Sequence, residues 1–267
     1  MDEYIRKLEA TTEIRKELLN DVILYINLPE GSSGLDVGCG IGHITRMLAE
    51  SLGSMGCITG IDASPAMIEF AVKYPGNSVF TDRMNFKVGS SNSLPFGDNS
   101  FDWAWSSDAV AYYREAEQFD SIKEMKRVVK PGGRVFLFIY SGQQLLPGYP
   151  VLEAKLNSTS TGIAPFRNGD DPETHYLRTL GLLRETGLVN TAVKAFTCSF
   201  HAPLDPQIHE GLHELILMRW NEQDAGLGDE DRAEYRRITD PSLPGFILNI
   251  PDYYGFFTYS LFQGTVI

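Results

Sequence analysis

Three glycines at alternate positions, Gly38, Gly40 and Gly42, follow the apolar stretch 34–37. Glycines let the chain turn tightly and bring backbone N–H groups close to a ligand at the start of the next helix. About twenty residues later, Asp62 ends a second apolar stretch, and its carboxylate can accept hydrogen bonds from both hydroxyls of a ribose. A nicotinamide-binding turn would have its third glycine at the position of His43. Together these residues predict a site for an adenosine-containing ligand.

The apolar pattern of the chain predicts a parallel sheet that brings these residues together. Five short apolar runs are expected to be strands. An amphipathic entry helix is expected before them at 12–26, and further helices among them at 44–52, 64–73 and 116–129. The expected strands are 34–37, 57–61, 84–88, 101–105 and 134–139. Later elements are expected to be a helix over 172–186, a strand over 193–200, a helix over 206–221 and a closing strand over 255–266. Strands that alternate with helices indicate an α/β fold with helices on both faces of the sheet.

Changes in composition along the chain predict its domain organisation. Residues 1–29 are expected to form an N-terminal helical segment, and residues 30–200 together with 253–267 the sheet domain. Residues 201–252 are expected to form a helical cap between the last two strands, over the sheet edge where ligands bind in open α/β folds. The stretch 141–171 is rich in Gly, Pro, Ser and Thr and predicts a lid loop.

Four motifs occur in order between residues 30 and 140: LDVGCGIG, GIDASPAMIEFA, LPFGDNSFDWAWSSDAV and VVKPGGRVFLF. They resemble the motifs of the class I S-adenosylmethionine (SAM)-dependent methyltransferases, in the small-molecule branch called type 11. The resemblance implies a Rossmann-like doubly wound, mostly parallel seven-stranded sheet with an antiparallel last strand and a cap insertion. It also implies SAM as cofactor, S-adenosylhomocysteine as product, and in-line transfer of the sulfonium methyl group to a small-molecule acceptor.

The resemblance assigns SAM contacts residue by residue. Asp36 and the glycine loop would hold the methionine part, Asp62 the ribose, and Ala63 and Met67 the adenine, although Asp36 could instead tie down the loop and Met67 could be core. Where the family often has an aspartate, this chain has Ser90, whose hydroxyl can accept the hydrogen bond of the adenine amino group. The expected cofactor-binding residues are Asp36, Gly38, Cys39, Gly40, Gly42, Asp62, Ala63, Met67, Ser90, Ser91, Asn92 and Ser107.

The acceptor side carries aromatic candidates rather than an evident catalytic group. Methyl transfer needs a general base only if the acceptor must lose a proton. The catalytic candidates are Tyr112, Tyr113 and Tyr140, which follow the fourth and fifth expected strands. The substrate-pocket candidates, for which packing is the alternative role, are Tyr112, Tyr113, Tyr140, His175, Trp220, Tyr253 and Tyr254. The run SSDAVAYY lacks the Asn/Asp-Pro-Pro-aromatic pattern of methyltransferases that act on nucleobase amines or glutamine amides.

A second motif, His209-Glu210-Gly211-Leu212-His213, matches HExxH. On a helix, two histidines four residues apart can bind zinc, with the glutamate as a base. The central glycine weakens a helix, and the motif lies in the expected cap, so we expect no metal. A zinc hydrolase through His209, Glu210 and His213 stays a remote alternative, and a non-catalytic SAM-binding regulatory module is a second.

The composition of the chain indicates which classes of partner and which cellular location to expect. The 267 residues carry a net charge of −12 without a basic run, which argues against nucleic acid as a partner. Three scattered cysteines and a charged N-terminus without an apolar signal sequence favour a cytoplasmic protein. No stretch has the length and apolarity of a membrane span. The methyl acceptor, the acceptor atom (O, N, C or S), the use of a base and the oligomeric state stay open.

Overall fold

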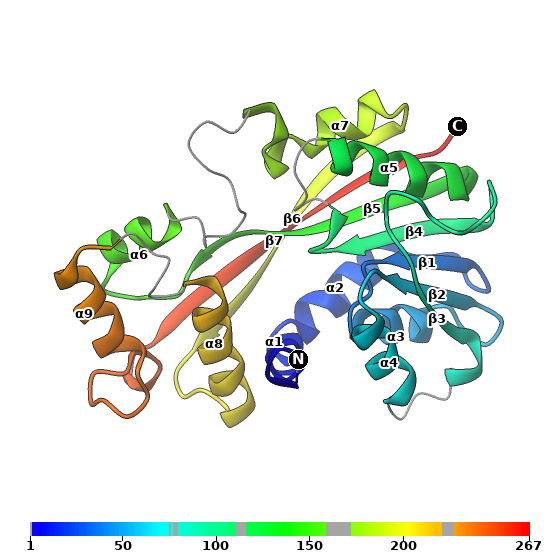
Figure 1. Ribbon diagram of the computed structural model, residues 1–267. Helices are drawn as coiled ribbons and strands as arrows, with labels where there is room; N and C mark the ends of the chain where they lie inside the picture. The colour runs from blue at the N-terminus through cyan, green and yellow to red at the C-terminus, as the bar shows by residue number, and fades with distance from the viewer. Residues whose placement is uncertain (1, 75, 77–79, 111–115, 159–171, 221–226) are drawn as a thin grey trace.

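The computed structural model describes residues 2–74, 76, 80–110, 116–158, 172–220 and 227–267. Within these residues, seven strands form one sheet in the order β3-β2-β1-β4-β5-β7-β6 (Figure 1). The strands are β1 (Ser33–Val37), β2 (Cys57–Asp62), β3 (Met84–Val88), β4 (Phe101–Ser107), β5 (Val129–Gln144), β6 (Val189–His201) and β7 (Tyr254–Thr265). The pairs from β3 to β5 are parallel, whereas β7 is antiparallel to both β5 and β6. The expected Rossmann-like sheet with an antiparallel last strand is confirmed.

Helices cover both faces of this sheet. Successive residues of a strand point to opposite faces, and apolar side chains on both faces of β4 are buried against helices. Trp103 and Trp105 of β4 pack in one buried cluster with residues of α2 and α3, whereas Ala104 packs in a second cluster with residues of α5. Figure 1 shows α5 and α7 on one side of the sheet and α2 and α3 on the other. The helices around the sheet are α2 (Lys16–Ile26), α3 (His43–Ser51), α4 (Pro65–Lys73), α5 (Ala116–Val128) and α7 (Thr179–Glu185).

The N-terminal segment differs from the single helix expected over 12–26. It forms two helices, α1 (Asp2–Glu13) and α2, with Ile14 and Arg15 between them. Ile14 is buried in the same cluster as the apolar face of α2, and the Arg15 side chain turns toward the end of β4. The period of the apolar residues predicted the buried face of α2 correctly. It did not reveal the break, because Ile14 continues the same apolar pattern.

The expected lid loop over 141–171 is wrong in its first part. Strand β5 continues to Gln144 and pairs with β7, with a register shift between Tyr140 and Gly142. Helix α6 (Pro150–Asn157) follows, and residues 159–171 lie outside the described part of the chain. The polar run after Tyr140 hides the strand in the sequence, because strand positions are recognised by apolar alternation. The long β5 carries Tyr140 to the carboxyl edge of the parallel strands.

Two helices, α8 (Pro206–Arg219) and α9 (Asp229–Thr239), lie between β6 and β7 in the chain. They gather with α6 at one end of the long strands β5, β6 and β7 (Figure 1). The helix expected over 172–186 is shorter, because two 3-10 turns, Pro172–Thr174 and Tyr176–Arg178, precede α7. Among the described residues, no helix is long and apolar enough to cross a membrane.

Candidate functional site

The glycine loop after β1 has the backbone conformation that its spacing predicts. Gly38, Gly40 and Gly42 have φ angles of 77°, 52° and 77°, in the left-handed region that favours glycine. A Cβ atom on Gly38 would lie 2.3 Å from the Cβ atom of Ala109, so this glycine is needed for close packing. A Cβ atom on Gly40 would meet nothing within 4 Å. Gly40 therefore borders open space, where a ligand can approach the backbone.

Asp62 joins the glycine loop to the end of β2. Its Oδ2 atom accepts a hydrogen bond from the Gly40 N–H over 2.9 Å, and its Oδ1 atom accepts one from the Ser64 N–H over 2.8 Å. These bonds fix the orientation of the carboxylate and leave lone pairs on both oxygens. The carboxylate is therefore held ready to accept hydrogen bonds from a pair of hydroxyl groups.

Two cavities meet at this carboxylate. The larger, of about 760 Å³, extends from the glycine loop toward α1, α8 and β7, and the smaller, of about 280 Å³, lies toward β3. Gly38, Asp62 and Ala109 line both. The arrangement suits an elongated ligand whose ribose lies at Asp62 and whose two ends point in opposite directions.

The smaller cavity contains the residues expected around adenine, with the exception of Met67. Ala63, Ser90, Ser91 and Asn92 line it, whereas Met67 lines the larger cavity. The Ser90 hydroxyl donates a hydrogen bond to Asn92 Oδ1 over 2.7 Å, so the Ser90 lone pairs are available to accept one. This geometry fits the expected replacement of the family aspartate by a hydroxyl group.

Asp36 lies behind the glycine loop rather than on a cavity wall. Its Oδ2 atom accepts a hydrogen bond from the Thr45 hydroxyl over 2.6 Å, and its side chain is buried. Burial raises the pKa of the Asp36 carboxyl to about 7. The geometry therefore favours the alternative role, in which Asp36 ties the loop to α3. Cys39 does line the larger cavity, and burial raises the pKa of its thiol well above the usual range.

Of the aromatic residues expected on the acceptor side, Tyr140 lines the larger cavity. Tyr112 and Tyr113 lie outside the described residues. The other four candidates border neither of the two cavities. Trp220 is buried and donates to Asn157, and Tyr253 is buried and donates to the Leu145 carbonyl. Tyr254 is exposed, and the His175 ring packs at a tilt of 43° against Tyr176. Their contacts support the packing role that the sequence left open.

A hydrogen-bonded cluster that the sequence did not predict lies around Asp108, the residue directly after β4. Asp108 follows β4 with a φ angle of 50°. Its Oδ1 atom accepts a hydrogen bond from the Tyr140 N–H over 2.9 Å, and its Oδ2 atom accepts one from the Tyr259 hydroxyl over 2.8 Å. Arg15 Nη1 lies 3.2 Å from Asp108 Oδ2 and also donates to the Tyr259 hydroxyl over 3.0 Å. Asp108, Arg15, Tyr140 and Tyr259 all line the larger cavity.

The place of Asp108, directly after an expected strand, was a signal that sequence analysis could have used. Arg15 and Tyr259 carried no such signal, because only the folded chain brings the α1–α2 junction, the end of β4 and β7 together.

His43, at the start of α3, also lines the larger cavity. Burial lowers the pKa of its imidazole to about 4, with a further contribution from the nearby charges of Arg46 and Arg15. His43 is therefore neutral at physiological pH. Its Nε2 atom and the Ser107 hydroxyl are buried and have no hydrogen-bond partner among the described residues. Buried polar atoms without partners mark places where a ligand can supply the missing hydrogen bonds.

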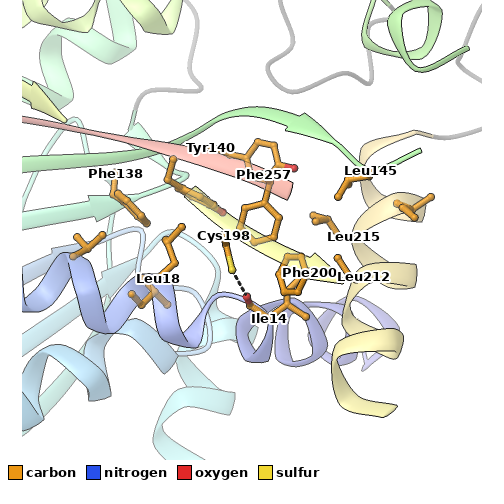
Figure 2. Packing of buried hydrophobic residues seen from close by; sticks show 14 of the residues in the cluster. Ile14, Leu18, Phe138, Tyr140, Leu145, Cys198, Phe200, Leu212, Leu215 and Phe257 are labelled. Atoms are coloured by element: carbon orange, nitrogen blue, oxygen red, sulfur yellow. Dashed lines mark hydrogen bonds between the residues drawn. The ribbon is translucent and has the colours of Figure 1, made fainter. Parts of the chain in front are cut away.

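An aromatic wall forms the far end of the larger cavity. The Tyr140 and Phe257 rings stack with centroids 5.6 Å apart, and Tyr259 meets Tyr140 edge-on at 5.1 Å. Helix α8 faces this wall, and Figure 2 shows Leu215 of α8 opposite the rings of Tyr140 and Phe257. The Cζ atom of Arg219 lies 3.8 Å from the centroid of the Tyr140 ring.

Glu210 and Gly211 of the HExxH motif contact the N-terminal segment, whereas the two histidines contact residues that follow α8 in the chain. Glu210 pairs with Arg6, His209 Nε2 lies 3.0 Å from Asn249 Oδ1, and His213 Nε2 lies 3.2 Å from the Thr239 carbonyl oxygen. A Cβ atom on Gly211 would lie 2.4 Å from Ile14 Cγ2, so the glycine allows the close crossing of α1 and α8. Within the described part of the chain, no group of three or more His, Cys, Asp or Glu side chains could hold a metal ion.

Comparison with known proteins identifies the region that contains the glycine loop. Residues 35–133 match the family model of a methyltransferase domain. This region is a class I SAM-dependent methyltransferase domain. The methyltransferase domain contains the glycine loop, Asp62, the Ser90 turn and Asp108. The cavity walls supplied by α1, α8 and β7 lie outside the match.

Relatives and solved structures extend this result. Demethylmenaquinone methyltransferase from Staphylococcus epidermidis is 34% identical over 126 residues, 47% of this chain and 50% of that protein. Erythromycin 3''-O-methyltransferase from Saccharopolyspora erythraea is 29% identical over 192 residues, 68% of this chain and 59% of that protein. This chain thus spans about half the length of the first of these relatives.

The fold is similar to that of Haemonchus contortus phosphoethanolamine N-methyltransferase 2 in complex with SAM. The TM-score is 0.51 with 18% sequence identity, over 92% of this chain and 52% of that one. At this identity the likeness supports the fold of the methyltransferase domain, and the acceptor has to be argued from the cavity itself.

Proposed function

We propose that this protein transfers the methyl group of SAM to a small-molecule acceptor. The observation that carries the proposal is the larger cavity, which joins the glycine loop and Asp62 to the aromatic wall of Tyr140, Phe257 and Tyr259 in one continuous space. A cofactor held at the loop and an acceptor held at the wall would face each other there. Fixing two reactants in line can remove roughly 7–11 kcal/mol of an activation barrier.

The residues of the two cavities fit SAM. Asp62 would accept the ribose hydroxyls, and Ser90 and Asn92, which line the smaller cavity, offer acceptors for the adenine amino group. The unpartnered Ser107 hydroxyl and His43 Nε2 offer hydrogen bonds to the methionine part, beside the open backbone at Gly40. When bound, SAM supplies an electrophilic methyl group on a sulfonium. The chain supplies position and exclusion of water, because α1 and α8 cover the cavity.

Several finer features belong to the same proposal. The acceptor is a small molecule. The names of two relatives, demethylmenaquinone methyltransferase and erythromycin 3''-O-methyltransferase, support this. Nucleic acid is not the substrate, which the net charge of −12 supports. The three free cysteines support a reducing, cytoplasmic location.

We also propose a division of the chain into three parts. Residues 1–29 form an N-terminal helical segment, and residues 30–200 together with 253–267 form the SAM-binding domain. Residues 201–252 form the cap, which the position of α8 and α9 between β6 and β7 supports.

The test combines binding and turnover. Isothermal titration of the purified protein with SAM and S-adenosylhomocysteine should give saturable binding, and Asp62→Ala should weaken it by about tenfold or more, because hydrogen bonds to a charged group are lost. Glu30→Ala, at an exposed carboxylate that lines neither cavity, is the control. Radiolabelled methyl transfer into small acceptors then separates a transferase from a SAM-binding regulatory module. Absence of binding, or equal binding by Asp62→Ala, would refute the proposal.

A further inference from the structure

The segment between α1 and α2 brings a guanidinium into the cavity that contains the glycine loop. Arg15 lines the larger cavity together with Gly40 of the loop and with Thr11 and Thr12 of α1. Arg15 lies outside residues 35–133, which match the methyltransferase domain, so the motifs of that domain give it no role. Its position raises the question of which group of the cofactor it would meet.

The Arg15 guanidinium keeps one N–H group for a ligand. A guanidinium has five N–H groups, one on Nε and two on each Nη atom. Nε donates to the Thr11 carbonyl over 3.1 Å, and Nη1 donates to Asp108 Oδ2 over 3.2 Å and to the Tyr259 hydroxyl over 3.0 Å. Nη2 donates one longer bond, of 3.4 Å, to the Thr12 hydroxyl. The second N–H of Nη2 has no partner among the described residues, so a ligand in the cavity can accept it.

The His43 imidazole offers a second donor close to Arg15. Its Nε2 atom is buried and has no hydrogen-bond partner among the residues that the structure describes. Burial, followed by the charges of Arg46 and Arg15, lowers the pKa of His43 to about 4, so the Arg15 guanidinium is close enough to act on the imidazole. A neutral imidazole with its proton on Nε2 can donate one hydrogen bond. The two nearby guanidinium charges favour an anionic ligand group here over a cationic one.

We propose that Arg15 and His43 together bind the carboxylate of the methionine part of SAM, each through one N–H group. This inference rests on the proposed function, in which SAM lies between the glycine loop and Asp62. The two oxygens of a carboxylate can accept from two donors at once, and such charge-assisted hydrogen bonds are strong. The ammonium group of the same methionine part is left to acceptors such as the Ser107 hydroxyl, which also has no partner among the described residues.

A carboxylate held in this way would join the cofactor to parts of the chain outside the matched domain. Arg15 bonds to Asp108 and Tyr259 at the acceptor end of the cavity, and its Nε atom bonds to Thr11 of α1. Fixing the guanidinium would therefore also fix the end of α1. We expect the complete cofactor to order the junction of α1 and α2, and a cofactor analogue without the carboxylate to leave it less ordered.

The first test compares two ligands that differ in the carboxylate alone. Isothermal titration of the purified protein with S-adenosylhomocysteine and with its decarboxylated analogue, S-(5′-adenosyl)-3-thiopropylamine, gives the two affinities. We expect S-adenosylhomocysteine to bind at least about tenfold more tightly, because hydrogen bonds to a charged group are lost with the analogue.

Variants locate this preference. Arg15→Gln should weaken S-adenosylhomocysteine binding by about tenfold and leave the affinity for the analogue unchanged, and Arg15→Lys should restore part of the loss. His43→Leu should weaken S-adenosylhomocysteine binding alone, whereas His43→Gln, whose amide N–H can still donate, should retain most of it. The matched control is Arg184→Gln, at an exposed arginine that bonds Thr191 and lines neither cavity.

A second measurement needs no variant. Amide hydrogen exchange of the wild-type protein over residues 12–18, at the junction of α1 and α2, should slow more with saturating S-adenosylhomocysteine than with the saturating analogue. This comparison decides the matter even if Arg15→Gln fails to fold.

Three results would overturn the inference: equal affinity of the wild type for the two ligands, loss of affinity for both ligands alike in Arg15→Gln, or a preference that survives in that variant. Equal protection of residues 12–18 by the two ligands would count against it in the same way. Failure of the wild type to bind S-adenosylhomocysteine would instead refute the proposed function.

Discussion

Tyr259 of β7 donates a hydrogen bond over 2.8 Å to Asp108, which lies 151 residues earlier in the chain at the end of β4. The bond joins the matched methyltransferase domain to the part of the chain outside it. Arg15 completes the contact from the segment between α1 and α2. The acceptor half of the cavity is thus built on a single cluster that three distant segments share.

Removal of the Tyr259 hydroxyl tests the strength of this connection. Tyr259→Phe should keep the stacking on Phe138, whose ring centroid lies 4.4 Å away, and lose the bond to the Asp108 carboxylate. A hydrogen bond to a charged group contributes about 1.5–3 kcal/mol, so the free energy of unfolding should fall by that amount in urea titrations. The control is Tyr176→Phe, which loses a bond to the uncharged Ser141 carbonyl, with an expected loss of about 1 kcal/mol. Equal losses in the two variants would contradict the role given to Asp108.

The two glycines of the loop should respond differently to alanine. Gly40→Ala should cost about 1–2 kcal/mol of unfolding free energy, because its φ angle of 52° is left-handed but its Cβ would meet nothing within 4 Å. Gly38→Ala adds a 2.3 Å clash with Ala109, worth roughly 1–3 kcal/mol more. The affinity for S-adenosylhomocysteine should fall more in Gly40→Ala than its small loss of stability would suggest. The added methyl group would point into the space that the ligand is proposed to fill. Calorimetry of both variants checks the ranking, and the same stability for both would be inconsistent with the packing described.

Asp36 predicts a pH dependence of stability. Its pKa is raised from the usual 3.8 to about 7 by burial, so the folded protein holds a proton over a range where the unfolded chain has lost it. The stability contributed by this proton is therefore complete at low pH. It falls as the pH rises from about 4 to about 7, by up to about 1.4 kcal/mol per pH unit, and is constant above.

The variant Asp36→Asn isolates this effect, because an amide oxygen can still accept the Thr45 hydrogen bond and does not ionise. The unfolding free energy of the wild type minus that of the variant should decrease across the same pH range in urea titrations. Curves that run parallel from pH about 4 to about 7 would show that Asp36 is ionised in the folded protein.

The sequence predicted the elements whose signals are local. The strand expected over 84–88 is β3, and the helix expected over 116–129 is α5 within one residue, because each has a full apolar period and a clear end. The Asp62 carboxylate was placed correctly from its position at the tip of a strand. The second half of β5 was missed, because its residues from Ser141 to Gln144 are polar and gain their strand geometry from pairing with β7.

The acceptor wall could not be predicted from the sequence for a related reason. Tyr253, directly before β7, and Tyr254, its first residue, were expected in the pocket, yet Phe257 and Tyr259 of the same segment line it. Choosing between neighbouring aromatic residues requires the register of β7 on β5, where Tyr140 lies opposite Tyr259. Register depends on the pairing of distant strands, and one residue of slip turns every side chain to the other face.

The crossing of α1 and α8 gives the last prediction. Gly211 has no room for a side chain, because a Cβ atom would lie 2.4 Å from Ile14 Cγ2 and 2.7 Å from the Ala10 carbonyl oxygen. Alanine normally stabilises a helix by about 1 kcal/mol relative to glycine, yet Gly211→Ala should push α1 away from α8. Tyr4 and Leu8 of α1 line the larger cavity, so the affinity for S-adenosylhomocysteine should fall, and amide hydrogen exchange over residues 2–13 should accelerate. The matched control is Gly181→Ala in α7, where a Cβ atom would meet nothing within 4 Å, and this variant should be stabilised with unchanged exchange in α1. If Gly211→Ala left exchange in α1 and ligand affinity at wild-type values, the close crossing would not be what holds α1 over the cavity.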